Sequence, residues 1–218
     1  MKLLIKHQTT QTTLGVTLFL GSVTGLSILY GTDFWNRGYV LWGIPRFLEY
    51  FTVLSNILGL VVSIQLMGFK EKEPIHLVPY STSYLLITLL VYHVLLRGVW
   101  APVGWVLLGD ILLHYINPLL LVVIHLFHSH SADHPKIPFS FIPRTLIAPA
   151  IYLLIILIIG EFTGRYPYPF LNVTNLGYPA VFVNALFIAL GFMLVATVVM
   201  MLDWVVRWVR WTRNRIVT

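Results

Sequence analysis

The sequence predicts an all-α fold, a polytopic integral membrane protein whose six transmembrane helices form one bundle over residues 1–218. Apolar residues make up 58% of the chain and charged residues only 10%, whereas a soluble domain carries about 25% charged residues. The apolar residues also gather in runs that approach the roughly 20 residues needed to cross a bilayer. Because so few charges cannot cover a water-facing surface, we expect lipid to surround these helices.

Six apolar runs follow one another along the chain. Their expected bounds are about 14–30, 46–67, 81–96, 103–127, 144–160 and 179–202. The sequence contains neither an internal repeat nor a stretch typical of a soluble domain, so we expect a single domain.

The first two runs have recognisable starts. Lys2 and Lys6 precede the first run as in a signal peptide, but no small-residue cleavage site follows Tyr30, so we expect a retained helix. Pro45 precedes the second run. It suits the first turn of a helix, because the N–H that proline lacks would be unpaired there in any case.

The later runs differ in polarity and length. The third and fourth carry ionisable side chains within apolar sequence, and the fifth is short. The sixth ends at Leu202 and is followed by a segment in which tryptophan and arginine alternate at helical spacing. We interpret that segment as an aromatic belt with a cytoplasmic charge anchor, in preference to a separate lipid-binding helix.

Basic residues set the expected orientation, because cytoplasmic loops of membrane proteins are enriched in Lys and Arg. Six spans place both termini on one side. The basic residues expected on that side are Lys2, Lys6, Lys70, Lys72, Lys136, Arg144, Arg207, Arg210, Arg213 and Arg215. Those expected on the other side are Arg37, Arg46, Arg97 and Arg165. We therefore expect a multi-pass membrane protein with both termini in the cytoplasm.

Composition excludes several function classes. The chain has no cysteine, so it has no disulfide, thiolate metal site or cysteine nucleophile. Its net charge of +6 does not indicate nucleic acid, because the basic residues lie between the apolar runs and at the ends. The segment FHSHSADH at 127–134 could bind a metal. No matching carboxylate cluster accompanies it, so we expect no metal and no organic cofactor.

Polar groups gather on one face of the fourth predicted helix. Asp110, His114 and Asn117 follow one another at i, i+4 and i+7 in LLGDILLHYINPLL, so they share a face. A central Asp costs about 2.5–3.5 kcal/mol on membrane-insertion scales, and such a group should face a neighbour or a cavity. In this spacing Asp110 can orient the His114 ring and stabilise its charged form.

The second predicted helix carries a matching polar face. Glu49, Thr52 and Asn56 follow one another at i, i+3 and i+7 around the segment YFTVLSN. At about 1.5 Å per residue, Thr52 lies roughly 10 Å into its helix and His114 roughly 18 Å into its own. A hydroxyl and an imidazole on two helices could therefore meet at one level.

Two interpretations of this pair remain open from spacing alone. A threonine hydroxyl becomes a nucleophile when a base takes its proton, and a neutral histidine is a suitable base. The reaction would then be acyl transfer from an ester. Alternatively, Thr52 bonds only to a carbonyl of its own helix, and His114 joins helices by a structural hydrogen bond.

Four segments together resemble a known family. They are FTVLSN at 51–56, LRGVW at 96–100, GDILLHYINPLL at 109–120 and GRYPYPFLNV at 164–173. The chain resembles bacterial multi-pass relatives of the androgen-induced-gene family, which includes intramembrane hydrolases of fatty acid esters of hydroxy fatty acids.

The resemblance implies a threonine–histidine hydrolase. The family threonine corresponds to Thr52 and the family histidine to His114, whereas Asp110 is not carried over as a catalytic residue. The sequence YPF corresponds to Tyr168, Pro169 and Phe170, in a segment expected to cap the outer mouth of the bundle.

These observations predict an ester hydrolase that acts on long-chain lipid esters within the membrane, with Thr52 as nucleophile and His114 as general base. The expected partners are the lipid ester and the surrounding lipids, and no nucleic acid. The residues expected to contact the substrate are Asn56, Arg97, Asp110, Asn117 and Tyr168. The alternative is a lipid-binding or transport protein without enzymatic activity. Against transport, the chain shows no inverted repeat with broken helices in corresponding positions.

Overall fold

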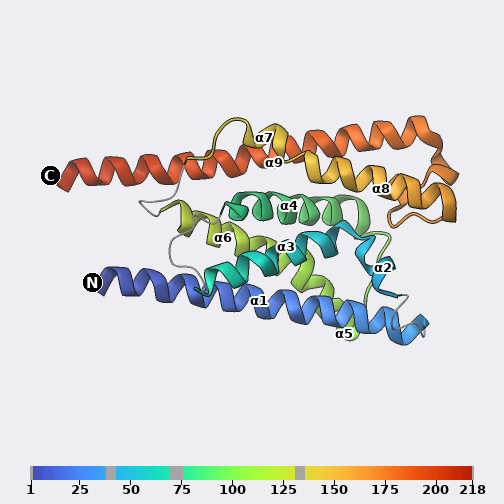
Figure 1. Ribbon diagram of the computed structural model, residues 1–218, viewed down its shortest axis with the longest axis horizontal. Coiled ribbons are helices and arrows are strands. Elements are labelled where there is room, and N and C mark those ends of the chain that lie inside the picture. Colours follow the sequence, from blue (N-terminus) through green and yellow to red (C-terminus); the bar gives the residue numbers. More distant parts are fainter. Residues whose placement is uncertain (1, 38–42, 69–75, 131–135, 218) are drawn as a thin grey trace.

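A computed structural model describes residues 2–37, 43–68, 76–130 and 136–217 (Figure 1). Every regular element among these residues is a helix, so the prediction of an all-α fold is confirmed. The α-helices are α1 (Lys2–Arg37), α2 (Gly43–Leu48), α3 (Phe51–Leu66), α4 (Leu77–Val91), α5 (Gly104–Ile111), α6 (Asn117–Ser129), α7 (Phe141–Arg144), α8 (Ile147–Thr163) and α9 (Val173–Val217). A π-helical turn, Tyr92–Leu96, extends α4, and a second, Leu112–Ile116, joins α5 to α6. A short 3-10 turn, Pro169–Leu171, precedes α9.

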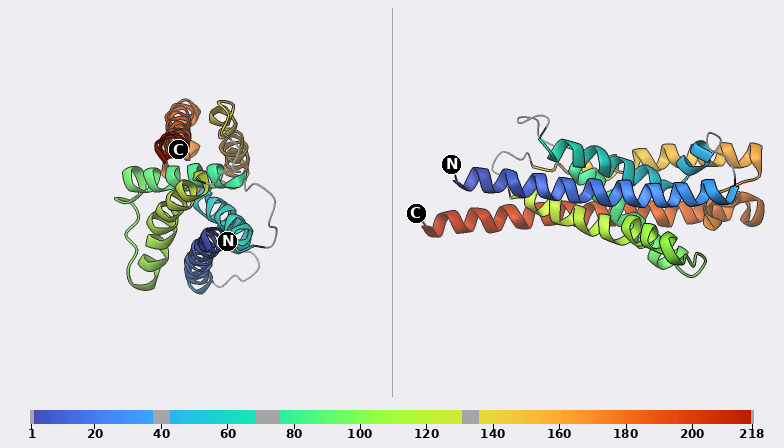
Figure 2. Two further views of the ribbon diagram at one scale, coloured as in Figure 1. Left: turned by 90° about the vertical axis from the view of Figure 1, so that its left-hand side faces the viewer. Right: turned by 90° about the horizontal axis from the view of Figure 1, so that it is seen from below.

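The long helices run along one direction of the molecule. Helix α1 lies on one side, α8 and α9 lie on the other, and α3, α4 and α6 lie between them (Figures 1 and 2). Both ends of the chain lie at the same end of the bundle (Figure 1). The start of α3, the short α2 and the connection from α8 to α9 lie toward the opposite end.

Helix α4 forms the centre of the bundle. In its most apolar stretch 56% of the residues are buried, compared with 17% for the helices Phe141–Thr163 and 22% for α9. Leu85 of α4 packs with Leu18 of α1, Val62 of α3 and Leu121 of α6 in one core cluster. A second cluster joins α4 to α9 around Phe192.

Small residues bring α1 close to α5. Any Cβ at Gly109 would lie 3.3 Å from the backbone oxygen of Gly25 and 3.0 Å from the side chain of Ile28. Close approach through small residues is typical of helix pairs in membranes. It brings the π-helical turn that follows α5 against α1 and α3.

Among the residues that the structure describes, five helices are long and apolar enough to cross a membrane, and α3, with 16 residues, is a shorter apolar helix. Many of their large apolar side chains are exposed, as expected of a surface in contact with lipid. The predicted spans 14–30, 81–96, 103–127 and 144–160 lie within or largely overlap such helices.

The predicted second span, 46–67, is wrong at its start. The chain forms the short helix α2, makes a turn at Glu49 and adopts an extended conformation at Tyr50, with φ −90° and ψ 123°, before α3 begins. Glu49 therefore does not share a helix face with Thr52 and Asn56. Thr52 is the second residue of α3, and the estimate that it lies roughly 10 Å into its helix is incorrect.

The predicted sixth span, 179–202, lies within the longer helix α9, which covers Val173–Val217. The helix has a kink at Gly177, whose φ of 76° and ψ of 158° are accessible mainly to glycine. From there it continues through the tryptophan- and arginine-rich segment to Val217. No helix-breaking residue follows Leu202, and this explains why the helix does not end where the apolar run ends.

Candidate functional site

His114 lies in the π-helical turn Leu112–Ile116, between α5 and α6. The turn has a cause in the sequence. Pro118 lacks an N–H, and its ring would collide with the carbonyl four residues earlier, which belongs to His114. Widening the helix by one residue removes that collision. Single π-helical turns of this kind occur often at functional sites.

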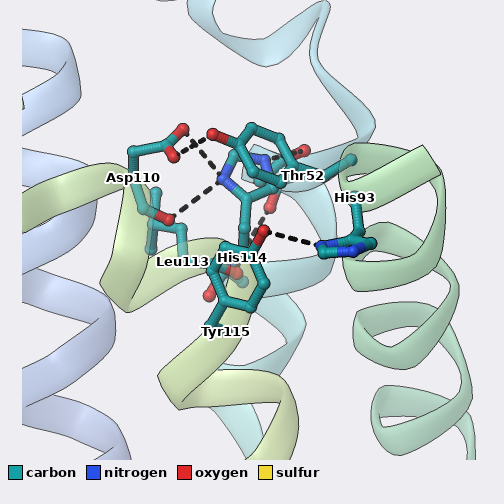
Figure 3. Close-up of polar contacts among 8 residues, drawn as sticks. Thr52, His93, Asp110, Leu113, His114 and Tyr115 are labelled. Carbon is teal, nitrogen blue, oxygen red and sulfur yellow. Dashed lines mark hydrogen bonds and ion pairs between the residues drawn. The ribbon is translucent and has the colours of Figure 1, made fainter. Parts of the chain in front are cut away.

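The His114 ring faces Thr52 across the contact between two helices. Thr52 Oγ1 lies 3.2 Å from His114 Nε2, and both residues are only 7% exposed (Figure 3). On the other side of the ring, Nδ1 lies 3.1 Å from the carboxylate Oδ1 of Asp110 and 3.1 Å from its backbone oxygen. Since both neighbours of Nδ1 are acceptors, the proton of the neutral ring belongs on Nδ1. Nε2 is therefore free to accept the proton of the Thr52 hydroxyl.

Asp110 is buried, with 1% exposure, and is held on both sides. One carboxylate oxygen faces His114, and the other accepts a hydrogen bond from the Tyr92 hydroxyl. The Tyr92 ring also stacks on the His114 ring, with centroids 4.0 Å apart and planes at 21°. Asp110 and Tyr92 therefore fix the imidazole in place, as the third member of a catalytic triad does.

Tyr92 is a site residue that the sequence analysis missed. It lies at the start of the π-helical turn after α4. In sequence it is one tyrosine among several, and only the bend of its helix and the crossing of α5 bring it to His114. No sequence signal could have identified it without knowledge of that crossing.

Thr52 sits at the first turn of α3, where backbone N–H groups have no helical partner. The backbone carbonyl of Tyr50, the residue before the helix, accepts hydrogen bonds from the backbone N–H groups of Val53 and Leu54. The Tyr168 hydroxyl lies beside this turn. Burial raises the pKa of Tyr168 above its ordinary value of 10.0, while hydrogen bonding with the Thr52 side chain and with the backbone of Thr52 and Phe51 acts in the opposite direction.

Two cavities meet at Thr52. The first, called here the apolar cavity, has a volume of about 190 Å³ and lies between α3, α4, α8 and α9. The second, called here the mixed cavity, has a volume of about 540 Å³ and includes Tyr92, Asp110 and His114 in its wall. Thr52 and Tyr168 line both. A molecule that occupied both cavities would therefore have its middle next to the Thr52 hydroxyl.

Asn56 and Asn117 do not line either cavity, so their predicted contact with a substrate is corrected. Asn56 donates to the backbone oxygens of Thr52 and Leu113 at 2.9 and 3.3 Å. Asn117 donates to Asn56 Oδ1 at 2.8 Å and to Ser22 at 3.2 Å. The side-chain N–H groups of Asn56 and Asn117 join α1, α3 and α6. These two side chains therefore hold together the helices that carry the site.

Arg97 and His93 also lie apart from the Thr52–His114 pair. Arg97 is exposed and lines neither cavity, so its predicted contact with a substrate is not supported. The ring of His93 faces the hydroxyl of Tyr115 at 3.1 Å (Figure 3). The predicted site residues that the structure brings together are therefore Thr52, Asp110, His114 and Tyr168.

Metal ligation has no support in the part of the chain that the structure describes. Within residues 2–37, 43–68, 76–130 and 136–217, no three His, Cys, Asp or Glu side chains are placed to hold an ion. His134, from the predicted histidine-rich segment, lies outside the described residues. His125 of α6 is buried, and its Nε2 lies 3.1 Å from the backbone oxygen of Val199, so it joins α6 to α9.

Comparisons of the chain with models of protein families, with curated proteins and with solved structures gave no match. The resemblance described above therefore rests on the quoted segments alone. Three of those segments reach the site, because FTVLSN contains Thr52, GDILLHYINPLL contains His114 and GRYPYPFLNV contains Tyr168. Segments far apart in the chain thus supply one compact set of polar side chains.

Proposed function

We propose that the protein is a membrane-embedded hydrolase of long-chain lipid esters, with Thr52 as nucleophile and His114 as general base. The observation that carries this proposal is the 3.2 Å separation between Thr52 Oγ1 and His114 Nε2. It is supported by the pairing of Nδ1 with Asp110, which leaves Nε2 unprotonated, and by the two cavities that meet at the hydroxyl. An activated nucleophile requires a base within hydrogen-bond reach and a third group that orients that base.

The first half of the reaction forms an acyl-enzyme. Thr52 Oγ1 attacks the ester carbonyl carbon while His114 Nε2 takes the hydroxyl proton. The tetrahedral intermediate then breaks its bond to the alcohol oxygen, and His114 returns the proton to that oxygen. In the second half, His114 takes a proton from water, the resulting hydroxide attacks the acyl-threonine, and the proton returns to Thr52 as the fatty acid leaves.

Tyr168 is proposed to stabilise the oxyanion of the tetrahedral intermediate. Its hydroxyl lies beside Thr52, and the N-terminal amides of α3 polarise it with the partial positive charge of the helix end. Because burial raises the pKa of Tyr168 above 10.0, the hydroxyl keeps its proton below that pH and stays a donor. Preorganised donors of this kind supply a large part of catalysis in acyl transfer.

Tyr168→Phe is expected to lower kcat by about 10²- to 10³-fold, the usual cost of removing one oxyanion donor. KM should change little, because the ring still fills the wall between the cavities. The measurement is steady-state hydrolysis of a long-chain ester in detergent or bilayer discs. Tyr166→Phe is the matched control, since Tyr166 lies in the same loop but lines neither cavity. Equal activity of Tyr168→Phe and wild type would remove Tyr168 from the mechanism.

The test of the proposal is covalent capture of Thr52. The purified protein is treated with a fluorophosphonate probe, the adduct is located by mass spectrometry, and hydrolysis of long-chain esters is followed in parallel. We expect the adduct on Thr52, with loss of labelling and turnover in Thr52→Ala. Thr82→Ala is the matched control, because Thr82 is also a buried threonine, on α4, and its hydroxyl donates to the backbone oxygens of Val78 and Leu121. Binding of ester without turnover by wild type would instead favour the lipid-binding alternative.

The proposal includes the setting of the chemistry in a bacterial inner membrane. Both ends of the chain lie at one end of the bundle (Figure 1), and the excess of basic residues expected there favours a cytoplasmic position for them. Thr52 would then lie toward the outer leaflet. Single cysteines introduced at chosen sites can report the orientation without interference, because the chain has no cysteine of its own.

A further inference from the structure

We infer that the two cavities divide the substrate at the scissile bond, so that the apolar cavity holds the acyl chain and the mixed cavity holds the alcohol. The inference rests on the proposed function and deepens it. It specifies which part of the ester each wall selects, and therefore which residues set the preferred acyl length.

The path of the proton carries the assignment. A general acid must lie within hydrogen-bond reach of the leaving oxygen, and the leaving oxygen of this reaction belongs to the alcohol. His114 lines the mixed cavity and does not line the apolar cavity. The alcohol must therefore lie in the mixed cavity, on the Nε2 side of Thr52, and the acyl chain must extend to the other side.

The water that hydrolyses the acyl-threonine must also come within hydrogen-bond reach of His114. It must contact His114 to lose a proton, so it has to enter the mixed cavity after the alcohol has left. An acyl chain in the apolar cavity would leave that position open. The opposite arrangement would place the acyl chain of the acyl-threonine between His114 and the incoming water.

The chemistry of the apolar cavity fits a hydrocarbon chain. Thr88 and Tyr152 are among its few polar neighbours, and both have partners elsewhere. The Thr88 hydroxyl donates to the backbone oxygen of Tyr84 at 2.8 Å, and the Tyr152 hydroxyl donates to that of Glu49 at 2.7 Å. A dry aliphatic cavity of about 150 Å³ is large enough to bind benzene. The apolar cavity, at about 190 Å³, is of similar size, so it can hold a hydrocarbon segment of several carbons against a mostly apolar wall.

Part of the wall of the apolar cavity is formed by α9, which contributes Ala185, Ile188, Ala189 and Phe192. Asn184 donates to the backbone oxygen of Phe170 at 2.9 Å, which fixes this part of α9 beside the loop that carries Tyr168. Ala185 comes directly after that contact, and Ala189 lies one turn, roughly 6 Å, further along the helix. Both alanines line the apolar cavity. Enlarging either alanine should reduce the space that the apolar cavity offers to an acyl chain.

The experiment measures kcat/KM for two ester series on purified protein in detergent. The first keeps para-nitrophenol as alcohol and lengthens the acyl group from butanoyl to palmitoyl. The second keeps octanoate and enlarges the alcohol from methanol to octanol. We expect Ala189→Phe to lower the palmitoyl-to-butanoyl ratio of kcat/KM by about tenfold or more, the usual effect of one misfitted methylene or larger group. Its relative preference among alcohols should stay unchanged.

A matched substitution in the mixed cavity should do the reverse. Val106 lines that cavity and not the apolar one, so Val106→Phe should shift the alcohol preference and leave the acyl preference unchanged. Fluorophosphonate labelling of Thr52 confirms that each variant is folded, and Ala189→Val provides a smaller change if the phenylalanine variant does not fold. The assignment would be overturned, with the hydrolase proposal intact, by either of two results. One is that Ala189→Phe changes the alcohol preference and Val106→Phe changes the acyl preference. The other is that the acyl preference stays unchanged in a folded Ala189 variant. Absence of turnover by wild type would overturn the proposed function and this inference together.

Discussion

His114→Ala is expected to abolish measurable ester hydrolysis, with kcat lowered by about 10⁴- to 10⁶-fold, the range found when the base of a hydroxyl–histidine pair is removed. The physical reason is that the Thr52 hydroxyl is a poor nucleophile without a proton acceptor. The only acceptor that the described structure brings to Thr52 Oγ1 from another helix is His114 Nε2, at 3.2 Å. The measurement is turnover of a long-chain ester together with the rate of fluorophosphonate labelling. Both should fall, because the probe requires the same activated oxygen.

The matched control for this prediction is His93→Ala. His93 is also in the bundle, in the π-helical turn after α4, but it faces Tyr115 and lines neither cavity. Its replacement should leave kcat within a small factor of wild type. If His114→Ala retains full labelling of Thr52 while remaining folded, the hydroxyl is activated by another group and the proposed mechanism fails.

Spacing along a single helix was sufficient to predict one contact of the site. Asp110 and His114 are four residues apart, and helix geometry alone brings such residues together. The contact survives the π-helical turn, because Nδ1 of His114 reaches both the carboxylate and the backbone oxygen of Asp110. Local periodicity therefore identified Asp110 as a residue that orients His114, although it could not identify Tyr92.

Contacts between helices could not be obtained in the same way. The approach of Thr52 to His114 depends on how α3 crosses the turn between α5 and α6, and no pattern within either helix specifies that crossing. The depth estimate for Thr52, roughly 10 Å into its helix, rested on a wrong helix start. It counted Thr52 from Pro45 in a continuous helix, whereas the chain turns at Glu49 and restarts at Phe51.

Polar residues at helical spacing were poor guides to which groups face a cavity. Asn56 and Asn117 share sequence features with Thr52 and His114, yet they bond to each other and to backbone oxygens. Burying an amide in an apolar bundle is costly unless it forms hydrogen bonds. A buried asparagine can therefore serve to connect two helices as readily as to bind a ligand. Tyr168, by contrast, was indicated only by the family resemblance, because its loop has no periodicity to interpret.

Asp110→Asn is expected to lower kcat by about 10²- to 10⁴-fold while KM changes little. Replacement of the triad carboxylate by an amide can cost about 10⁴-fold in kcat, because the amide favours the wrong tautomer of the histidine. Here the backbone oxygen of Asp110 also lies 3.1 Å from Nδ1 and remains as an acceptor. It can hold part of the population in the productive tautomer, and this sets the lower end of the expected range. The measurement is kcat and KM for one ester, with the labelling rate of Thr52 as a second readout.

A buried aspartate at a distance provides the control for Asp110→Asn. Asp203 of α9 is 3% exposed and pairs with Arg207 at 2.8 Å, near the end of the bundle where the chain terminates. Asp203→Asn weakens a buried ion pair and should lower the melting temperature without lowering kcat per folded molecule. Asp110→Asn should do the opposite, since the amide keeps the size of the carboxylate and can still accept the hydrogen bond from Tyr92. Loss of stability with unchanged kcat in Asp110→Asn would show that the carboxylate serves the fold alone and that His114 needs no third group to orient it.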